Sequence, residues 1–355
     1  MHSNSISRFV LGNRNVAANN THRIHMKHLA HRLCTAPMMD WSDRHCRYFF
    51  RQLTQHATLY TEMITCAALM HGDVAHHLQF NAAEHPIALQ LGGSDSRDMA
   101  HCASLGEQYG YDEININCGC PSERVQHGSF GACLMSEPQV VADCVRAMRE
   151  RVAIPITVKH RLGIDRIEDY DFARRFIETV AQAGCDLFIV HARNAVLRGL
   201  SPKDNREVPT LRYGEVYQLH RDFPELIIII NGGVQDWDAI DGHIQHVDGV
   251  MLGRSAYHNS YLLAQADRRL FSSSRPTPTR DEIARAMFAY AQSQIPQGVS
   301  LRSIVRHMLG LFHGQPNARV WRHMLSDARQ LASNDPVLIL AALEACQYEK
   351  LENVI

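Results

Sequence analysis

The sequence contains no apolar run long enough to cross a membrane. Its longest run of Leu, Ile and Val, residues 226–230, has five residues, whereas a membrane-spanning helix needs about 20. No hydrophobic signal segment opens the chain, so we do not expect the protein to be exported. The ten cysteines are scattered without a paired framework, which is typical of proteins from a reducing compartment. These absences predict a globular cytoplasmic protein.

Three further absences narrow the function classes. The formal net charge of the 355-residue chain is −1, so the protein as a whole does not attract nucleic acid, and local patches must hold any polyanion. Cys118 and Cys120 have no second ligand pair at zinc spacing, so we predict no metal site. The sequence has no GxGxxG element and thus no Rossmann-type site for a nicotinamide cofactor.

Strand-like runs recur along the chain from His31 onward. Their first residues lie 23 to 42 residues apart, which leaves room for a helix and two loops in each interval. Alternation of eight strands with helices is typical of a parallel (β/α)₈ barrel, so we predict an α/β protein with a TIM barrel. The runs are 33–38, 58–63, 87–92, 113–118, 155–160, 187–192, 226–231 and 249–254.

The two ends of the chain differ from this pattern. Residues 1–27 are rich in Asn, Ser, His and Arg without a sustained period, and we expect a mobile N-terminal arm. After the barrel, residues 28–270, a polar linker at 271–280 leads to a small all-α helical bundle at 281–355. The helices expected in that bundle are 281–292, 299–313, 317–331 and 335–348.

Apolar residues at helical spacing support the helices between the strands. Ser136 and Gln139 have the spacing of a capping box and precede one apolar stripe, so we predict a helix N-terminus there. Phe176 and Val180 belong to a second stripe, and Gly184 is expected to end that helix. We assign the apolar residues of both stripes to the core.

A cysteine follows the fourth expected strand in an unusual setting. Cys120 stands between Gly119, which bends the backbone, and Pro121, which stiffens it. Strand side chains repeat every two residues, so Asn117 places a neutral amide near this thiol. With no cation in the adjoining sequence, the thiol is expected to stay protonated near its reference pKa of about 8.5, which suits a proton donor. A packed structural cysteine is the alternative.

Polar or glycine-rich residues mark seven of the eight expected strand ends. Catalytic groups of a TIM barrel project from the carboxyl ends of its strands. A lone His or Lys at such a position is more often structural, but the repetition favours a site. The residues concerned are Met38, Gln90, Asn117 with Cys120, Lys159, His191, Asn231 with Gly232 and Gly233, and Gly253 with Arg254.

These strand ends have the features of a site for a phosphorylated planar cofactor. Residues 231–233 and 253–254 offer backbone N–H groups and a guanidinium where TIM barrels usually bind phosphate, although each segment would also serve as a simple turn. Lys159 and Gln90 lie where they would reach a planar ring, and a cation there would stabilise a reduced flavin. His191 is placed to meet the ribityl chain or the phosphate.

Several motifs together resemble those of the tRNA-dihydrouridine synthases of the A subfamily. The resemblance runs from about Arg32 to the C-terminal helices. Cys118 departs from the family pattern, which usually has an aliphatic residue there, and His160 replaces the commoner threonine. The motifs are Asn-Cys-Gly-Cys-Pro at 117–121, Ser-Pro-Lys-Asp-Asn-Arg at 201–206, Ala-Pro-Met-Met-Asp-Trp at 36–41, Ala-Leu-Gln-Leu-Gly-Gly at 88–93, Gly-Ala-Cys-Leu at 131–134, Thr-Val-Lys-His-Arg at 157–161 and Val-His-Ala-Arg at 190–193.

The resemblance implies an FMN-dependent oxidoreductase that uses NADPH to reduce the C5=C6 bond of D-loop uridines, at tRNA positions 20 and 20a, to dihydrouridine. Hydride would pass from FMN to C6, and Cys120 would protonate C5 from the opposite face. The residues expected to hold FMN are Pro37, Met38, Met39, Gln90, Lys159, His191, Asn231, Gly232, Gly233, Gly253 and Arg254. Those expected to contact tRNA are Asn117, Lys203, Arg206, Arg319 and Arg322.

Other functions stay open from the sequence. An FMN barrel acting on a free pyrimidine, such as dihydroorotate, needs no arginine-bearing helical appendage, and larger versions carry iron–sulfur cysteine runs that this sequence lacks. A tRNA-binding module with an incidental flavin would keep the basic residues but have no use for Cys120. Arg302 and Arg306 either contact phosphate or belong to a solvated helix face. The residues imply no membrane and no obligate protein partner.

Overall fold

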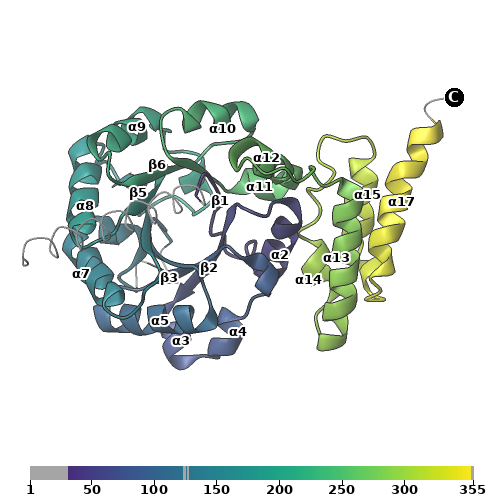
Figure 1. The fold of residues 1–355 in the computed structure, drawn as a ribbon, viewed down its shortest axis with the longest axis horizontal. Helices are drawn as coiled ribbons and strands as arrows, with labels where there is room; N and C mark the ends of the chain where they lie inside the picture. Colours follow the sequence, from purple (N-terminus) through teal and green to yellow (C-terminus); the bar gives the residue numbers. More distant parts are fainter. Residues whose placement is uncertain (1–30, 123–124, 126–127, 353–355) are drawn as a thin grey trace, which may run out of the picture.

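The computed structural model describes residues 31–122, 125 and 128–352. The expected N-terminal arm, residues 1–27, therefore lies outside the described residues. Within them, eight parallel strands pair in sequence order and close through β1 and β8 into a barrel (Figure 1), which confirms the predicted TIM barrel. The strands are β1 (Leu33–Thr35), β2 (Thr58–Thr65), β3 (Ile87–Gly92), β4 (Glu113–Cys118), β5 (Ile156–Ile164), β6 (Leu187–Ala195), β7 (Ile227–Asn231) and β8 (Gly249–Leu252).

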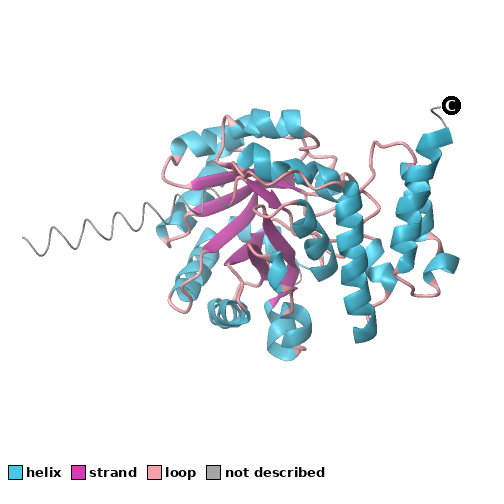
Figure 2. Cartoon of the chain, turned by 45° about the vertical axis from the view of Figure 1, so that its right-hand side comes forward, coloured by secondary structure: helices cyan, strands magenta, loops and turns pink. Residues whose placement is uncertain are grey.

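Helices surround the barrel and cover the outer face of its strands (Figures 1 and 2). Every connection between successive strands contains at least one helix, as a parallel sheet requires. The α-helices up to the end of the barrel are α2 (Arg44–Leu53), α3 (Cys66–His71), α4 (Val74–Leu78), α5 (Ser96–Tyr109), α7 (Pro138–Arg149), α8 (Tyr170–Gln182), α9 (Tyr213–Asp222), α10 (Trp237–Ile244), α11 (Arg254–His258) and α12 (Ala266–Leu270). The 3₁₀ helices are η1 (Ala82–Glu84), η2 (Gly131–Ser136), η3 (Asp204–Arg206), η4 (Ser260–Gln265) and, in the bundle, η5 (Ile295–Gln297).

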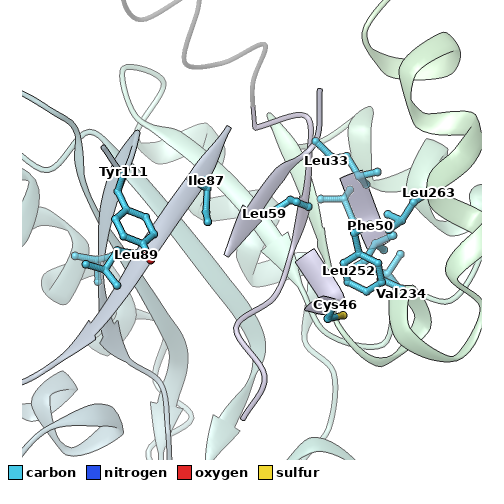
Figure 3. Packing of buried hydrophobic residues seen from close by; sticks show 14 of the residues in the cluster. Leu33, Cys46, Phe50, Leu59, Ile87, Leu89, Tyr111, Val234, Leu252 and Leu263 are labelled. Atoms are coloured by element: carbon cyan, nitrogen blue, oxygen red, sulfur yellow. The ribbon is translucent and has the colours of Figure 1, made fainter. Parts of the chain in front are cut away.

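The main hydrophobic core lies between the strands and the surrounding helices. Leu59 of β2 and Leu89 of β3 belong to this core together with Phe50 of α2 (Figure 3). All three side chains are fully buried. Because strand side chains alternate between the two faces, their sequence neighbours point into the barrel. Packing on the outer face therefore fixes which residues reach the barrel interior.

The barrel interior is divided into an aliphatic and a polar half. The aliphatic half comes from β6 to β8 and β1 and includes Ile189, Ile229 and Met251. The polar half comes from β3 to β5. Its buried polar side chains are Gln90, Glu113, Asn115 and Thr157. Buried polar groups need hydrogen-bond partners, so this half depends on a network of them.

One expected helix start is wrong. Helix α7 begins at Pro138, and its N-cap residue Glu137 makes no side-chain capping bond, so Ser136 and Gln139 form no capping box. Ser136 instead ends η2. The fixed φ of proline suits the first position of a helix, which explains the later start. Gly184 follows α8 with a φ of +101°, as expected of a residue that ends a helix.

The C-terminal helices form a bundle beside the barrel (Figures 1 and 2). They are α13 (Arg280–Gln294), α14 (Leu301–Val305), α15 (Ala318–Ser326), α16 (Ala328–Leu331) and α17 (Val337–Glu352). No described helix is long and apolar enough to cross a membrane.

Two of the helices expected in the bundle are shorter than predicted. The run 299–313 is helical only over α14 and continues as turns. A Cβ at Gly310 would lie 2.5 Å from the carbonyl oxygen of Tyr257, so close packing against the barrel shapes this segment. The run 317–331 breaks at Asp327, whose side chain accepts the backbone N–H of Arg329 and caps α16.

Aromatic and charged contacts join the bundle to the barrel. Tyr290 of α13 stacks on Tyr48 of α2 with ring centroids 3.8 Å apart, and its hydroxyl lies 2.8 Å from His45 Nδ1. Asp43, the N-cap of α2, forms an ion pair with Arg306 at 2.5 Å. Arg306 therefore connects the bundle to the barrel. It fits neither of the alternatives from the sequence, which were a phosphate contact and a solvated helix face.

Candidate active site

A cavity of about 1070 Å³ opens at the carboxyl ends of the strands. Its walls come from segments spread over the whole barrel sequence, so only the closed barrel brings them together. All residues that the sequence analysis assigned to catalysis or FMN binding line it. They are Cys120, Pro37, Met38, Met39, Gln90, Lys159, His191, Asn231, Gly232, Gly233, Gly253 and Arg254.

Hydrogen bonds hold the loop that follows β4. Asn117 Oδ1 accepts the backbone N–H groups of Gly119 at 3.1 Å and of Cys120 at 3.0 Å. The Cys120 carbonyl accepts the backbone N–H of Ala132 at 2.9 Å. Gly131 has a φ of +78°, and a Cβ there would lie 2.7 Å from the Cys120 carbonyl oxygen. The backbone around Cys120 is therefore held on both sides, and position 131 requires glycine.

Arg161 ties this loop to its neighbours, a role that the sequence analysis missed. Its Nε donates to the Gly119 carbonyl at 3.0 Å, and its Nη1 donates to the carbonyls of Asn194 and Asn205 at 2.9 Å each. A signal was present in the sequence, because Arg161 follows Lys159 by two positions and therefore shares its face of β5.

Three cations lie within electrostatic reach of the Cys120 thiol. They are Lys159 and Arg161 of β5 and Arg206 of η3. None of them adjoins Cys120 in the chain. The absence of a cation from the local sequence therefore gave an incomplete view of the thiol's surroundings.

Lys159 and His191 have strongly perturbed pKa values. Burial and the neighbouring Arg161 lower the pKa of Lys159 to about 7, while the Cys120 thiol acts in the opposite direction. Among the described residues, no acceptor or carboxylate pairs with the Lys159 ammonium. Burial, followed by Arg161 and Lys159, lowers the pKa of His191 well below its usual value. His191 is therefore neutral at physiological pH. An anion bound near Lys159 would favour the protonated, charged form of that lysine.

A glycine cradle lies at the ends of β7 and β8. Gly232 and Gly233 have φ values of +109° and +73°, and a Cβ on Gly232 would lie 2.5 Å from His191 Cδ2. The Tyr213 hydroxyl donates to the Gly232 carbonyl at 2.8 Å and fixes this turn. Within the described part of the chain, the backbone N–H groups of Gly233 and Gly253 donate to no acceptor. Free N–H groups beside a cavity are suited to bind an anion.

The residues predicted to contact tRNA do not all lie together. Asn117 and Arg206 line the cavity, whereas Lys203 lies outside its wall as the N-cap residue of η3. Arg319 and Arg322 are exposed on α15 of the bundle and do not line the cavity.

Several cavity residues lie outside the sequence prediction, and three of them are aromatic or histidine side chains. Trp41, stacked on Tyr257 at 4.4 Å, lines the wall together with His258 and His313. His313 belongs to the bundle, so the bundle contributes to the cavity. In the portions of the chain that are described, no group of three or more His, Cys, Asp or Glu side chains is arranged to hold a metal ion.

The closed barrel, with a thiol, a lysine and a glycine cradle around one cavity, defines a TIM-barrel enzyme. A family model described as "Dihydrouridine synthase (Dus)" matches residues 34–349. The chain therefore belongs to the dihydrouridine synthase family, which confirms the resemblance seen in the motifs.

Relatives named tRNA-dihydrouridine(20/20a) synthase match nearly the whole chain. The one from Synechocystis sp. is 54% identical over 89% of this chain and 95% of its own length. The Escherichia coli relative is 52% identical, covering 90% of this chain and 97% of the relative. The Vibrio cholerae relative is 50% identical over 90% and 98%.

Proposed function

We propose that this protein reduces the C5=C6 bond of D-loop uridines in tRNA, at positions 20 and 20a, to 5,6-dihydrouridine. The names and coverage of the relatives support this substrate. The observation that carries the proposal is that Cys120, Lys159 and the glycine cradle line one cavity. The family match does not favour a free pyrimidine as substrate, and a flavin with an incidental role would leave Cys120 without a function.

FMN is the cofactor that these residues fit. The Gly233 and Gly253 N–H groups, with the Arg254 guanidinium, would hold its phosphate. The Arg254 guanidinium also pairs with Glu207, so phosphate binding would compete with that exposed carboxylate. A Cβ at Gly232 would collide with His191, and a Cβ at Gly233 would collide with Leu211 and Tyr213. Only glycine therefore lets the backbone of the β7 turn lie this close to the cavity.

The remaining cofactor residues would surround the ring and its ribityl chain. Lys159, which has no described partner, would face the polar edge of the ring, and Gln90 would bond the same edge. Neutral His191 would meet the ribityl chain. Pro37, Met38 and Met39, which follow β1, would cover the ring. Bound FMN, reduced by NADPH, would supply the hydride that uracil C6 receives.

Cys120 would complete the reaction as the proton donor. Reduction adds a hydride to uracil C6 and a proton to C5, and Cys120 would deliver that proton from the face opposite to the hydride. Its held backbone keeps the thiol in place. Lys159, Arg161 and Arg206 would stabilise the thiolate that remains, because nearby cations favour an anion. The thiolate would then regain its proton from solvent.

The bundle, residues 281–355, would act as the tRNA-binding domain. A stacked uridine cannot enter the cavity, so it must be turned out of the tRNA elbow at a cost of a few kcal/mol. Arg206 at the mouth, Lys203 beside it, and Arg319 and Arg322 on α15 would bind the tRNA backbone and offset that cost. Asn117 would face the uracil inside the cavity. This substrate also supports a cytoplasmic location.

The decisive assay supplies NADPH and tRNA that lacks dihydrouridine to the purified protein. We expect dihydrouridine to form in tRNA, with free uridine and dihydroorotate unused. Cys120→Ala should retain FMN and oxidise NADPH while tRNA reduction falls by about 10²- to 10⁴-fold, as is typical of a lost general acid. Near-normal reduction by Cys120→Ala would remove the proton-donor role, and turnover of a free pyrimidine would remove the tRNA assignment.

A further inference from the structure

A single chain of hydrogen bonds runs through the polar half of the barrel interior. The Thr157 hydroxyl donates to Glu113 Oε1 at 2.6 Å and accepts from Asn115 Nδ2 at 2.8 Å. Asn115 Oδ1 accepts from Gln90 Nε2 at 2.8 Å. Gln90 Oε1 accepts from Asn117 Nδ2, also at 2.8 Å. The chain thus connects a buried carboxylate below the cavity to the loop that carries Cys120.

Both ends of this chain fix the direction of its donors. At the upper end, the backbone N–H groups of Gly119 and Cys120 can only donate, so Asn117 must present its oxygen to them. At the lower end, Glu113 is fully enclosed. Burial raises the pKa of Glu113, but the charge of His31 and hydrogen bonds from His31, Thr157 and Tyr60 outweigh burial, so the net effect is a lower pKa. An ionised carboxylate only accepts.

Because the ends are fixed, every side-chain amide between them has one allowed orientation. Turning any one amide would place two N–H groups, or two oxygens, opposite each other inside the barrel, where no hydrogen bond can form between them. Asn117 Oδ1 already accepts two bonds, so this residue presents only its second N–H to the cavity. The chain therefore sets the polarity of the cavity floor as well as the position of the loop.

Packing alone gives no reason for this chain. The other half of the same interior is filled by aliphatic side chains such as Ile189 and Ile229, and a buried carboxylate is costly unless it is paired. Neither Glu113 nor Thr157 lines the cavity, so neither touches cofactor or substrate.

We propose that Glu113 and Thr157 are positioning residues for the reaction. Through Asn115 and Gln90 they hold Asn117 in the orientation that keeps the Cys120 loop in place. The inference rests on the proposed function, because it assumes that Cys120 is the proton donor. It adds to that function a requirement for groups deep in the barrel that the reaction itself never contacts.

The test compares Thr157→Val with Thr157→Ser in the FMN-loaded protein. Valine has the shape of threonine but no hydroxyl, so it breaks the chain with little change in packing, whereas serine keeps the hydroxyl. We expect kcat for tRNA reduction to fall by about 10- to 100-fold in Thr157→Val, the scale of a displaced catalytic group. The KM for tRNA, the FMN content and NADPH oxidation should stay within about twofold. Thr157→Ser should recover most of kcat.

A matched control acts on the same carboxylate oxygen. The Tyr60 hydroxyl also donates to Glu113 Oε1, at 2.7 Å, and lies beside the Thr157 hydroxyl, but it links no amide of the chain. Tyr60→Phe should therefore leave kcat within about twofold of the parent, although it removes a buried hydrogen bond of similar strength. An equal loss of kcat in Tyr60→Phe and Thr157→Val would show a general structural effect and overturn the proposal. So would normal kcat in Thr157→Val, or equal losses in the Val and Ser variants.

A second readout does not depend on turnover. Iodoacetamide labelling of Cys120, followed by mass spectrometry of the peptide, should change severalfold in rate in Thr157→Val and not in Tyr60→Phe. An unchanged rate in Thr157→Val would overturn the proposal. If Thr157→Val does not fold, Asn115→Leu breaks the chain at the next link, and normal kcat in that variant also overturns it. Retained tRNA reduction in Cys120→Ala would instead refute the proposed function.

Discussion

Replacing Lys159 with methionine should stabilise the FMN-free protein and weaken its hold on FMN. Burial and Arg161 lower the pKa of Lys159 from 10.5 to about 7, with Cys120 acting in the opposite direction. A decrease of this size corresponds to about 4 to 5 kcal/mol of destabilisation by the charged lysine. The side chain keeps some contact with water in the open cavity, so we expect a gain of about 1 to 3 kcal/mol from methionine.

The pH dependence of this gain follows from the same pKa. Between about pH 7 and 10.5, the unfolded chain carries a proton on Lys159 that the folded protein lacks. The stability of the parent therefore rises with pH across this window. The advantage of Lys159→Met should be largest below pH 7 and should disappear toward pH 10.5.

Urea denaturation of both FMN-free proteins, near pH 6.5 and again near pH 9.5, measures the difference in unfolding free energy. FMN retention after gel filtration measures the opposite effect, because FMN bound as proposed would lose a nearby cation. Lys159→Arg, which keeps the charge, is the control for FMN retention. Equal stability of parent and Lys159→Met near pH 6.5, or an advantage that grows with pH, would refute this account of the lysine.

Two other variants test the Cys120 loop and the tRNA contacts. Gly131→Ala should reduce tRNA reduction by about 100-fold, because the added methyl group must displace the Cys120 carbonyl by a fraction of an ångström or more; single-turnover reduction of bound tRNA measures this, and a normal rate would contradict the tight packing. Arg319→Ala combined with Arg322→Ala should weaken tRNA binding and lower its salt slope by about two units, with NADPH oxidation unchanged. Affinity measured over a salt series checks this, and a slope equal to that of the parent would place the tRNA elsewhere.

The barrel and its cavity were predictable from the sequence because both depend on local patterns. Alternation of strands and helices fixes the topology, and the barrel then brings strand ends such as Gln90, Lys159 and His191 to one edge. Of the cations around Cys120, Lys159 and Arg161 share one face of β5 and follow from the same pattern, whereas the approach of Arg206 to the thiol depends on the loop after β6. The hydrogen-bond chain below the cavity escaped notice for a similar reason, because its members come from three different strands.

The errors in the bundle have a related cause. Helical periodicity predicted a helix at 299–313, but the segment after α14 packs its backbone against α11 of the barrel, and Gly310 allows that approach. The expected capping box at Ser136 failed through competition between two local signals, in which Pro138 set the helix start. Tertiary contact sets where α14 ends, and a neighbouring proline sets where α7 begins. Neither boundary can be predicted from the spacing of apolar residues alone.

The joint between barrel and bundle connects the proposed tRNA-binding domain to the proposed cofactor site. Asp43 caps α2 and also pairs with His307 and Arg306. Although burial raises the pKa of Asp43, its contact with His307, followed by the Cys46 backbone N–H and Arg306, lowers that pKa well below the usual range. Just before it, Ser42 bonds the backbone of Met38, so the segment that would cover the ring is anchored from the same turn. If tRNA binding moved the bundle, the movement would therefore be transmitted to the turn that positions Met38. The bundle would accordingly have two roles. Its exposed arginines would bind tRNA, and the turn at Arg306 would hold the segment that forms part of the cavity wall.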